Sequence, residues 1–528
     1  MEVQMKALKF LVTCVILVTL AGCCGHHAAC PAGSRGVSAD VSAPPAALAP
    51  SEPDAEKTAN PLAAQIADIL DAPETRNAFW GVYIKRAGEE APLFALNEER
   101  GFMPASNMKI YTTSAALCKL GKDHVFHTGI FYRGAVDGQG ILNGDLIIRG
   151  SGDPSISGRY RDGVETQAIL AAWAEAVKAA GIKVIRGRVI ADSTYFSDNG
   201  ISSTWENGYL TDWYAAPSSA LSVDDNWFLT NALPGEKVGD PIRIEPLETA
   251  YVTLKNDAVT SVSSAADTLV CLRQIEGNIV TVSGWLPLGS ERSRLRGCVY
   301  DGSLYAATLV REALIRNGIP VAGTAADAGQ MDPGEIGAMY DSATLVHTHV
   351  SPPLSEIIAI VNKPSQNFYA DMLLKVLGKQ FAGDGSFSAG RDVVRDFLRS
   401  IGAPNIEDFT MVDGSGLGRK NLVQPRQSVR LLEYMTTRRD FTAFYDSLPI
   451  AGMDGTTGGR MKNTPALGNV HAKTGFITGA RALSGYVDDQ DGNRWIFSMM
   501  CNNFTCPVGR IDAIIDRVCV ALASSGGE

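Results

Sequence analysis

Hydrophobic and polar positions change their spacing several times along the chain. From Pro61 onward, apolar residues recur three and four positions apart, which predicts a helix, and strand-like runs follow at 80–85 and 92–97. A second helix is expected from Ser106 to about Leu120. These elements indicate the beginning of a mixed α/β domain.

The spacing changes again between about residues 124 and 345. Short apolar runs alternate there with turn residues, which is typical of β-strands, and one clear helix is expected at 166–181. After this stretch helical spacing returns, and the chain closes with strand-like runs and a helix near 508–523. We therefore expect one α/β domain in two sequence halves, 61–123 and 346–528, interrupted by a mostly β insertion at 124–345.

The N-terminus has the features of an export signal. Lysines precede an apolar run at 10–20 that is too short to cross a bilayer as a stable helix. The run ends in Leu-Ala-Gly-Cys, and the small residues before Cys23 resemble the lipobox of bacterial lipoproteins. That resemblance implies a signal peptide at 1–22, cleavage before Cys23 and lipid on its thiol. The alternative is an ordinary secretory signal with an incidental cysteine.

The expected anchor leads into a linker and indicates a location. Residues 23–60 are rich in Ala, Pro and Ser and are expected to form a disordered tether. Position 24 is Cys rather than Asp, so retention in the inner membrane is not indicated. We expect a periplasmic protein anchored to the outer membrane through lipid.

Composition and charge exclude some classes of function. The chain has 528 residues, of which 45% are hydrophobic and 20% charged, an ordinary globular composition. A formal net charge of −10 disfavours a general nucleic-acid binder, which would carry a basic face. The cysteines show no C-x-x-C spacing and the histidines no H-E-x-x-H spacing, so we expect no metal site and no cofactor.

Export to an oxidising compartment permits disulfides. Cys271 and Cys298, which flank a strand-like stretch, are the best candidate pair, and one pair is plausible among Cys501, Cys506 and Cys519. The connectivity itself does not follow from the sequence.

The first chemical motif is Ser106-Asn107-Met108-Lys109. On a helix, residues three apart share a face, so the Lys109 amine is expected beside the Ser106 hydroxyl. A serine hydroxyl is a poor nucleophile unless a base takes its proton, and a lysine whose ammonium is destabilised can be that base. Lys109 is the only lysine in the chain with a serine three residues before it.

The second motif is Lys473-Thr474-Gly475, the only K-[ST]-G in the chain. We expect it to begin a strand, where the missing side chain of Gly475 leaves room for a substrate backbone. Lys473 and Thr474 are expected to hold a substrate carboxylate, and the charge of Lys473 to keep Lys109 neutral. The backbone N–H groups of Phe476 and Ser106 are candidate oxyanion donors.

The third motif, S-x-N, occurs at two candidate positions. Ser197-Asp198-Asn199 is the more literal match but lies in a turn-rich stretch of the insertion. Ser365-Gln366-Asn367 opens an apolar helix in the α/β half, 108 residues before Lys473. We choose Ser365 and Asn367, because a loop at a helix start can direct a hydroxyl and an amide into a cleft.

The joint occurrence of these motifs resembles the class C low-molecular-mass penicillin-binding proteins, the D-alanyl-D-alanine carboxypeptidase/endopeptidase family. The likeness runs from about residue 61 to 520 and includes the segments at 144–157, 214–228, 305–323, 413–425 and 451–461. It implies a penicillin-recognising α/β domain, with a five-stranded antiparallel sheet and helices on both sides. It also implies two mostly β inserted domains, at about 124–148 with 225–345 and at 149–224.

The resemblance also assigns roles to residues. It implies that Ser106 is the acyl-ester nucleophile, Lys109 its proton acceptor, and Ser365 a proton relay to the leaving amine. Asn367 would position the substrate amide, and Lys473 and Thr474 would bind the terminal carboxylate.

A further part of the resemblance concerns specificity. Arg419 and Tyr214 match positions near the family's pocket for the diaminopimelate side chain. Glu206 and Asp212 are both candidates for recognising its amino group. The residue after K-T-G departs from the family pattern, because Phe476 replaces a usual Thr or Ser.

The implied reaction is hydrolysis of D-alanyl-D-alanine peptides of peptidoglycan through a serine acyl-enzyme that β-lactams trap. Two alternatives remain at this point. A β-lactamase would have far fewer residues between the first and third motifs, and no carboxylate motif for fast deacylation is evident. An inactive, lipid-tethered penicillin-binding scaffold is disfavoured because Ser106, Lys109, Ser365 and Lys473 are all present.

Overall fold

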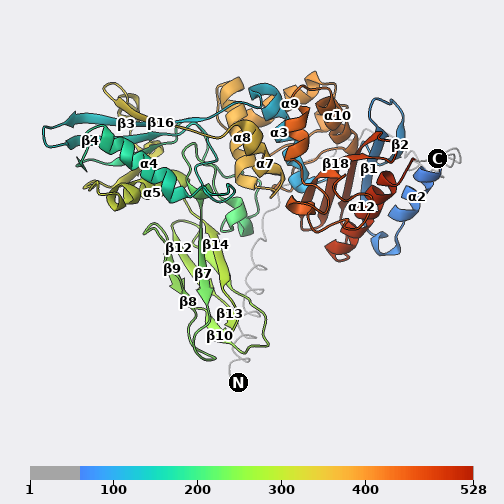
Figure 1. Ribbon diagram of the computed structural model, residues 1–528, viewed down its shortest axis with the longest axis horizontal. Coiled ribbons are helices and arrows are strands. Elements are labelled where there is room, and N and C mark those ends of the chain that lie inside the picture. Colours follow the sequence, from blue (N-terminus) through green and yellow to red (C-terminus); the bar gives the residue numbers. More distant parts are fainter. Residues whose placement is uncertain (1–59, 527–528) are drawn as a thin grey trace, which may run out of the picture. The chain divides into compact units, whose positions relative to one another are not determined.

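The computed structural model describes residues 60–526 of the chain (Figure 1). The expected signal peptide at 1–22, the expected lipid attachment site Cys23 and nearly all of the expected tether at 23–60 lie outside the described residues. Within residues 60–526, none of the helices combines the length and the apolar composition that a bilayer crossing requires.

A five-stranded sheet forms the centre of the α/β domain, and all of its neighbouring strands run antiparallel. In sheet order its strands are β17 (His471–Ile477), β18 (Ala480–Asp488), β19 (Arg494–Asn502), β1 (Phe79–Arg86) and β2 (Pro92–Leu96). The sheet joins strands from both ends of the chain, since β1 pairs with β19 over its whole length. This confirms the predicted fold class.

Helices cover both faces of this sheet. Successive side chains of a strand point to opposite faces, and the central strands have apolar side chains on both. In β1, Val82 and Ile84 belong to the core beneath α2 (Pro61–Leu70) and α12 (Val508–Ala523), whereas Tyr83 belongs to the core on the opposite face. The helices on that opposite side are α3 (Met108–Leu120), α7 (Leu354–Asn362), α8 (Asn367–Ala382), α9 (Phe387–Ser400), α10 (Pro425–Thr436) and α11 (Phe441–Ser447).

The insertion between the two halves contains a six-stranded mixed sheet and three small sheets. The large sheet consists of β15 (Ala325–Asp327), β6 (Val189–Asp192), β4 (Ile141–Arg149), β3 (His127–Val136) and β16 (Thr344–Val350), with β5 (Val184–Ile185) beside β4. The small sheets consist of β14 (Ser293–Cys298), β7 (Trp227–Leu233) and β8 (Arg243–Ile244); β11 (Val270–Arg273), β12 (Ile279–Ser283) and β9 (Thr253–Asn256); and β10 (Val259–Ser261) with β13 (Trp285–Pro287). Its helices are α4 (Thr166–Ala179), α5 (Gly302–Arg316) and α6 (Pro333–Gly337).

The insertion is more helical than the sequence pattern indicates. Only the helix at 166–181 was expected, and α4 confirms it, but α5 is a second long helix over Gly302–Arg316. Asp301 caps α5 by accepting a hydrogen bond from the Leu304 N–H at 2.9 Å. The buried side of α5 packs into the same core as α4. The division of the insertion into two domains, at 124–148 with 225–345 and at 149–224, stays a prediction. Strand pairing joins β4, which begins in the first of these, to β6, which lies in the second.

The expected disulfides are not formed. All six cysteines at residues 60–526 are free thiols. The predicted pair Cys271 and Cys298 lies on different strands, where Cys271 is opposite Val282 and the Cys298 thiol donates to the Leu210 carbonyl at 3.1 Å. Cys501, in β19, and Cys519, in α12, are both buried in the core beneath α2 and α12, and both are free thiols.

Candidate active site

Ser106 lies in a short 3-10 turn, Ala105–Asn107, that runs directly into α3. Ala105 has a φ of +47°, a left-handed conformation that is uncommon for a residue with a side chain. Ser106 is partly exposed, and the Nζ of Lys109, one helical turn later, lies 2.9 Å from its Oγ. The i, i+3 spacing therefore brings the two side chains together as expected.

Lys109 is completely buried among oxygen atoms. Its Nζ lies 2.6 Å from Asn367 Oδ1, 2.7 Å from the Ser415 carbonyl oxygen and 2.9 Å from Ser106 Oγ. Burial lowers the pKa of Lys109 to about 7, against the opposing charges of Asp371 and Asp413.

Burial is thus the largest cause that favours the neutral amine. The two lysines also affect each other, because the pKa of Lys473 is lowered by burial and further by the charges of Lys109 and Arg481. That Lys473 keeps Lys109 neutral stays a prediction.

Lys473 and Thr474 lie on β17, beside the start of α3. The Lys473 Nζ donates to Ser365 Oγ at 2.9 Å and to the Thr474 carbonyl at 2.9 Å. The Asn107 side-chain amide donates to the Lys473 carbonyl at 2.8 Å and links the first motif to the second. A Cβ on Gly475 would lie 2.2 Å from the Pro104 carbonyl oxygen, so only glycine lets β17 approach the Ser106 turn this closely.

The third motif, Ser365-Gln366-Asn367, contacts both Lys109 and Lys473. Ser365 has a φ of +63°, which turns the chain just before α8, and Asn367 is the first residue of that helix. The Asn367 Nδ2 donates to the Tyr214 carbonyl at 2.9 Å, which orients its Oδ1 toward Lys109. Ser365 and Asn367 therefore contact Lys473 and Lys109, respectively.

The rival motif at 197–199 lies elsewhere in the structure. The Ser197 hydroxyl donates to Asp384, and Asp198 forms an ion pair of 2.6 Å with Lys375. The Asp198 carboxylate also accepts from the Gly200 N–H at 2.9 Å, as in a turn. The structure thus brings Ser365, and not Ser197, to the cluster of motifs.

A cavity of about 270 Å³ opens beside Ser106. Its walls include the predicted residues Ser106, Asn367, Tyr214 and Phe476, and also Tyr209, Gly416, Leu417, Ile477 and Thr478. The Phe476 side chain is 53% exposed, and its ring lies 5.6 Å from the Arg481 guanidinium carbon. The apolar and aromatic lining suits the stem of an extended side chain.

Charged groups lie next to this cavity. The Arg419 guanidinium donates to the Thr478 carbonyl at 2.9 Å and lies 3.5 Å from the Glu206 carboxylate. Asp212 instead accepts from the Tyr214 hydroxyl at 2.7 Å, and burial together with this carboxylate raises the pKa of Tyr214. Of the two acidic candidates, Glu206 is the one beside Arg419.

Sequence reasoning missed the loop that contacts Lys109 through the Ser415 carbonyl. Asp413 is fully buried and accepts from the N–H groups of Gly416 and Gly418, both at 2.7 Å. It also accepts from the Trp205 indole at 2.8 Å and the Asn421 amide at 3.0 Å. The signal for this loop was the run Asp-Gly-Ser-Gly-Leu-Gly, which we noted only as part of the resemblance.

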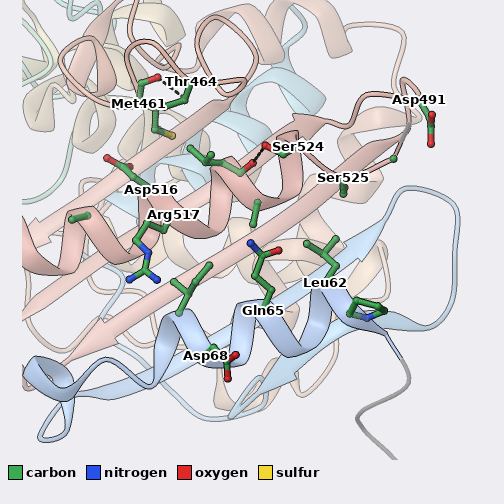
Figure 2. Close-up of a pocket in the computed structure, with 16 residues that line it drawn as sticks. Leu62, Gln65, Asp68, Met461, Thr464, Asp491, Asp516, Arg517, Ser524 and Ser525 are labelled. Carbon is green, nitrogen blue, oxygen red and sulfur yellow. Dashed lines mark hydrogen bonds between the residues drawn. The ribbon is translucent and has the colours of Figure 1, made fainter. Parts of the chain in front are cut away.

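A separate groove of about 1030 Å³ lies between α2 and α12. Figure 2 shows the side chains of Leu62, Gln65, Asp68, Asp516 and Arg517 along it. None of the predicted site residues lines this groove, so its position gives no support to a catalytic role.

Comparisons with known proteins agree with the motifs and the fold. Residues 62–518 match the D-Ala-D-Ala carboxypeptidase 3 (S13) family. A D-alanyl-D-alanine carboxypeptidase of Actinomadura sp. (strain R39) is 33% identical over 474 residues, covering 87% of this chain and 84% of that protein. The D-alanyl-D-alanine carboxypeptidase DacB of Haemophilus influenzae is 28% identical over 446 residues, covering 82% of this chain and 87% of that protein.

A solved structure extends the agreement to three dimensions. The crystal structure of penicillin binding protein 4 (dacB) from Haemophilus influenzae superposes with a TM-score of 0.76 at 24% identity, covering 87% of this chain and 99% of that chain. That level of identity supports the shared fold. Together with the family match over most of the sequence, these findings show that the chain belongs to the D-Ala-D-Ala carboxypeptidase 3 (S13) family.

Proposed function

We propose that this protein is a serine-type D-alanyl-D-alanine carboxypeptidase, also able to act as a D,D-endopeptidase on cross-linked peptides, and that β-lactams inhibit it by acylating Ser106. The observation that carries the proposal is the contact of Ser106 Oγ with the buried amine of Lys109, at 2.9 Å. The family relationship supplies the substrate class.

The contacts of Lys109 define where its protons lie. A neutral amine has two N–H groups and one lone pair. Asn367 Oδ1 and the Ser415 carbonyl oxygen are both acceptors and take the two N–H groups. The lone pair is then left for the hydroxyl hydrogen of Ser106, which is the arrangement that a general base requires.

The reaction follows from this arrangement. Ser106 Oγ forms a bond to the carbonyl carbon of the penultimate D-alanine while its proton passes to Lys109. The bond from that carbon to the leaving nitrogen then breaks, and the proton returns to the departing amine through the Ser365 hydroxyl. Water then attacks the ester carbon while its proton passes to Lys109, the bond from that carbon to Ser106 Oγ breaks, and the proton passes from Lys109 to Ser106 to restore the hydroxyl. The backbone N–H groups of Ser106 and Phe476 would stabilise the oxyanion.

Binding of the substrate carboxylate would use the K-T-G strand. Thr474 and Lys473 would contact the terminal carboxylate, and Asn367 the amide of the substrate backbone. A bound carboxylate would favour the charged form of Lys473, which burial disfavours in the free site. On the acyl side, Tyr214 and the pair Arg419 and Glu206 would contact the diaminopimelate side chain of a peptidoglycan stem peptide.

Penicillin labelling tests the proposal on the unaltered protein. We expect one penicilloyl group per chain, located on Ser106 by peptide mapping after mass spectrometry. An adduct on another residue, or no adduct on folded protein, would contradict the mechanism. Slow loss of the adduct, with release of D-alanine from D-alanyl-D-alanine peptides, would separate this function from that of a β-lactamase.

We propose further that the protein is a periplasmic lipoprotein held at the outer membrane through Cys23. The lipobox-like sequence before Cys23 supports this proposal. Several acyl chains on one residue would anchor the protein firmly, because a single chain binds membranes only marginally. The S13 domain described at residues 60–526 would then act on peptidoglycan from that anchor.

Replacing Cys23 by serine is expected to remove the protein from the membrane fraction. The measurement is fractionation of cells followed by intact-mass analysis of the recovered protein. The purified Cys23→Ser domain should bind penicillin as the parent does, because Cys23 lies outside the S13 match at 62–518. An N-terminus without lipid in the parent protein would refute the anchor.

A further inference from the structure

The buried part of helix α8 contains three polar side chains on one face, among mostly apolar residues. Asn367, Asp371 and Lys375 are spaced one helical turn apart. Asp371 is 1% exposed and Lys375 is fully buried. Placing charged groups in a core is costly unless they are paired or hydrogen-bonded, so each requires a partner.

Two of the three have partners that explain them. Asn367 contacts Lys109 directly, as described above. Lys375 pairs with Asp198 at 2.6 Å and donates to the Ser218 carbonyl at 2.7 Å, which fastens the insertion to α8. Asp371 lies between them and, within residues 60–526, forms neither a hydrogen bond to Lys109 nor an ion pair.

Asp371 instead binds the backbone of the loop that reaches Lys109. One of its carboxylate oxygens accepts from the Gly414 N–H at 2.8 Å and from the Ser415 N–H at 3.0 Å. The Gly414 carbonyl is held from the other side by the Thr112 hydroxyl at 2.8 Å. The next carbonyl, of Ser415, accepts from Lys109 Nζ at 2.7 Å.

This geometry lets Asp371 act on one of the two acceptors that orient the amine. The Gly414 N–H and the Ser415 N–H belong to the two successive peptide units before the Ser415 carbonyl, so the Asp371 oxygen fixes the backbone that leads into that carbonyl. The carbonyl itself shares a peptide plane with the Gly416 N–H, which donates to Asp413 at 2.7 Å. If that carbonyl turned away, Lys109 could direct an N–H group at Ser106 Oγ, and its lone pair would no longer face the hydroxyl hydrogen. A misplacement of about 1 Å can cost on the order of 100-fold in rate.

We infer that Asp371 is a positioning residue for the reaction, which fixes the two peptide units before the Ser415 carbonyl so that the lone pair of Lys109 faces Ser106. The inference rests on the proposed function of Ser106 and Lys109. Asp371 acts through its hydrogen-bond acceptor oxygen, and not by contact with the substrate.

Two nearly isosteric variants separate the acceptor from the charge. Asp371→Asn removes the charge but keeps an oxygen that can accept both N–H bonds. Asp371→Leu removes the charge and the acceptor together. Ser428→Ala is the matched control, because it removes the buried contact of 2.7 Å with the Tyr111 hydroxyl, which also lies on α3 but away from Lys109.

The measurement is the rate of Ser106 acylation by penicillin as a function of pH, on protein shown to be folded. We expect the plateau rate of Asp371→Asn and of Ser428→Ala to stay within about threefold of the parent, and that of Asp371→Leu to fall by on the order of 100-fold. In both Asp371 variants, the pH of half-maximal rate should not rise, because any charge on Asp371 raises the pKa of Lys109, while burial and Asp413 raise the pKa of Asp371 and favour its neutral form.

Equal plateau rates in Asp371→Asn and Asp371→Leu would overturn the inference. If both are fast, the acceptor is not needed, and if both are slow, the charge is what matters. If the plateau rate of Ser428→Ala fell as much as that of Asp371→Leu, the loss would come from disturbed packing in general, and the inference would fail. Should Asp371→Leu not fold, Asp371→Ala gives the same comparison. Failure of the parent to acylate at all would instead refute the proposed function.

Discussion

Replacing Ser106 by alanine is expected to abolish both D-alanine release and the penicilloyl adduct. The ester can form only at the Ser106 oxygen, so its removal eliminates the covalent route rather than slowing it. Loss of the nucleophile in other serine hydrolases costs on the order of 10⁶ in kcat. The melting temperature should change little, because Ser106 is partly exposed and its hydroxyl contacts Lys109, which keeps two other acceptors.

The matched control is Ser114→Ala on the same helix. The Ser114 hydroxyl is buried and has no hydrogen-bond partner within the described part of the chain. The Ser114→Ala variant should therefore be acylated by penicillin at the parent rate. Residual penicillin labelling of Ser106→Ala at another serine, or equal loss in both variants, would show that Ser106 is not the nucleophile. D-alanine release and intact mass after penicillin treatment provide the two readouts.

Replacing Lys109 by arginine is expected to slow acylation by several orders of magnitude. A guanidinium stays protonated at all accessible pH values, so it offers no lone pair to the Ser106 hydroxyl. Lys109→Met tests the same loss without a charge in the buried site. Both should still show the far-ultraviolet circular dichroism of the parent. Acylation by Lys109→Arg at near the parent rate would remove Lys109 from the role of base.

The pH dependence of acylation in the parent follows from the same residue. Burial lowers the pKa of Lys109 to about 7, so the neutral, basic form predominates above pH 7 and the charged form below it. The rate of penicillin acylation should therefore be constant at higher pH and fall about tenfold for each pH unit well below 7. A midpoint near the pKa of a free lysine, about 10.4, would contradict this assignment.

Sequence spacing was sufficient where the relevant geometry is local. Ser106 and Lys109 share a helical face because they are three residues apart, and the spacing alone predicts their contact. The strands at 80–85 and 92–97 and the helix near 508–523 were also predicted from their apolar runs, and β1, β2 and α12 confirm them. The antiparallel arrangement of the sheet came from the family resemblance instead of from any period.

Tertiary structure was needed wherever partners lie far apart in the chain. The Ser415 carbonyl is 306 residues from Lys109, and a backbone oxygen has no residue type that a motif could reveal. The expected pairing of Cys271 with Cys298 was wrong because separation in sequence says nothing about which strands align.

The sequence by itself therefore determined the three motifs, the family and the order of the two halves around the insertion. Only the tertiary structure decided which S-x-N motif meets Lys473, that Asp371 and Asp413 hold the loop beside Lys109, and that burial lowers the pKa of this lysine. The physical reason is that burial depends on every element packed around a group. Helices α3 and α8 and the loop at 413–418 enclose Lys109 only after the whole chain has folded.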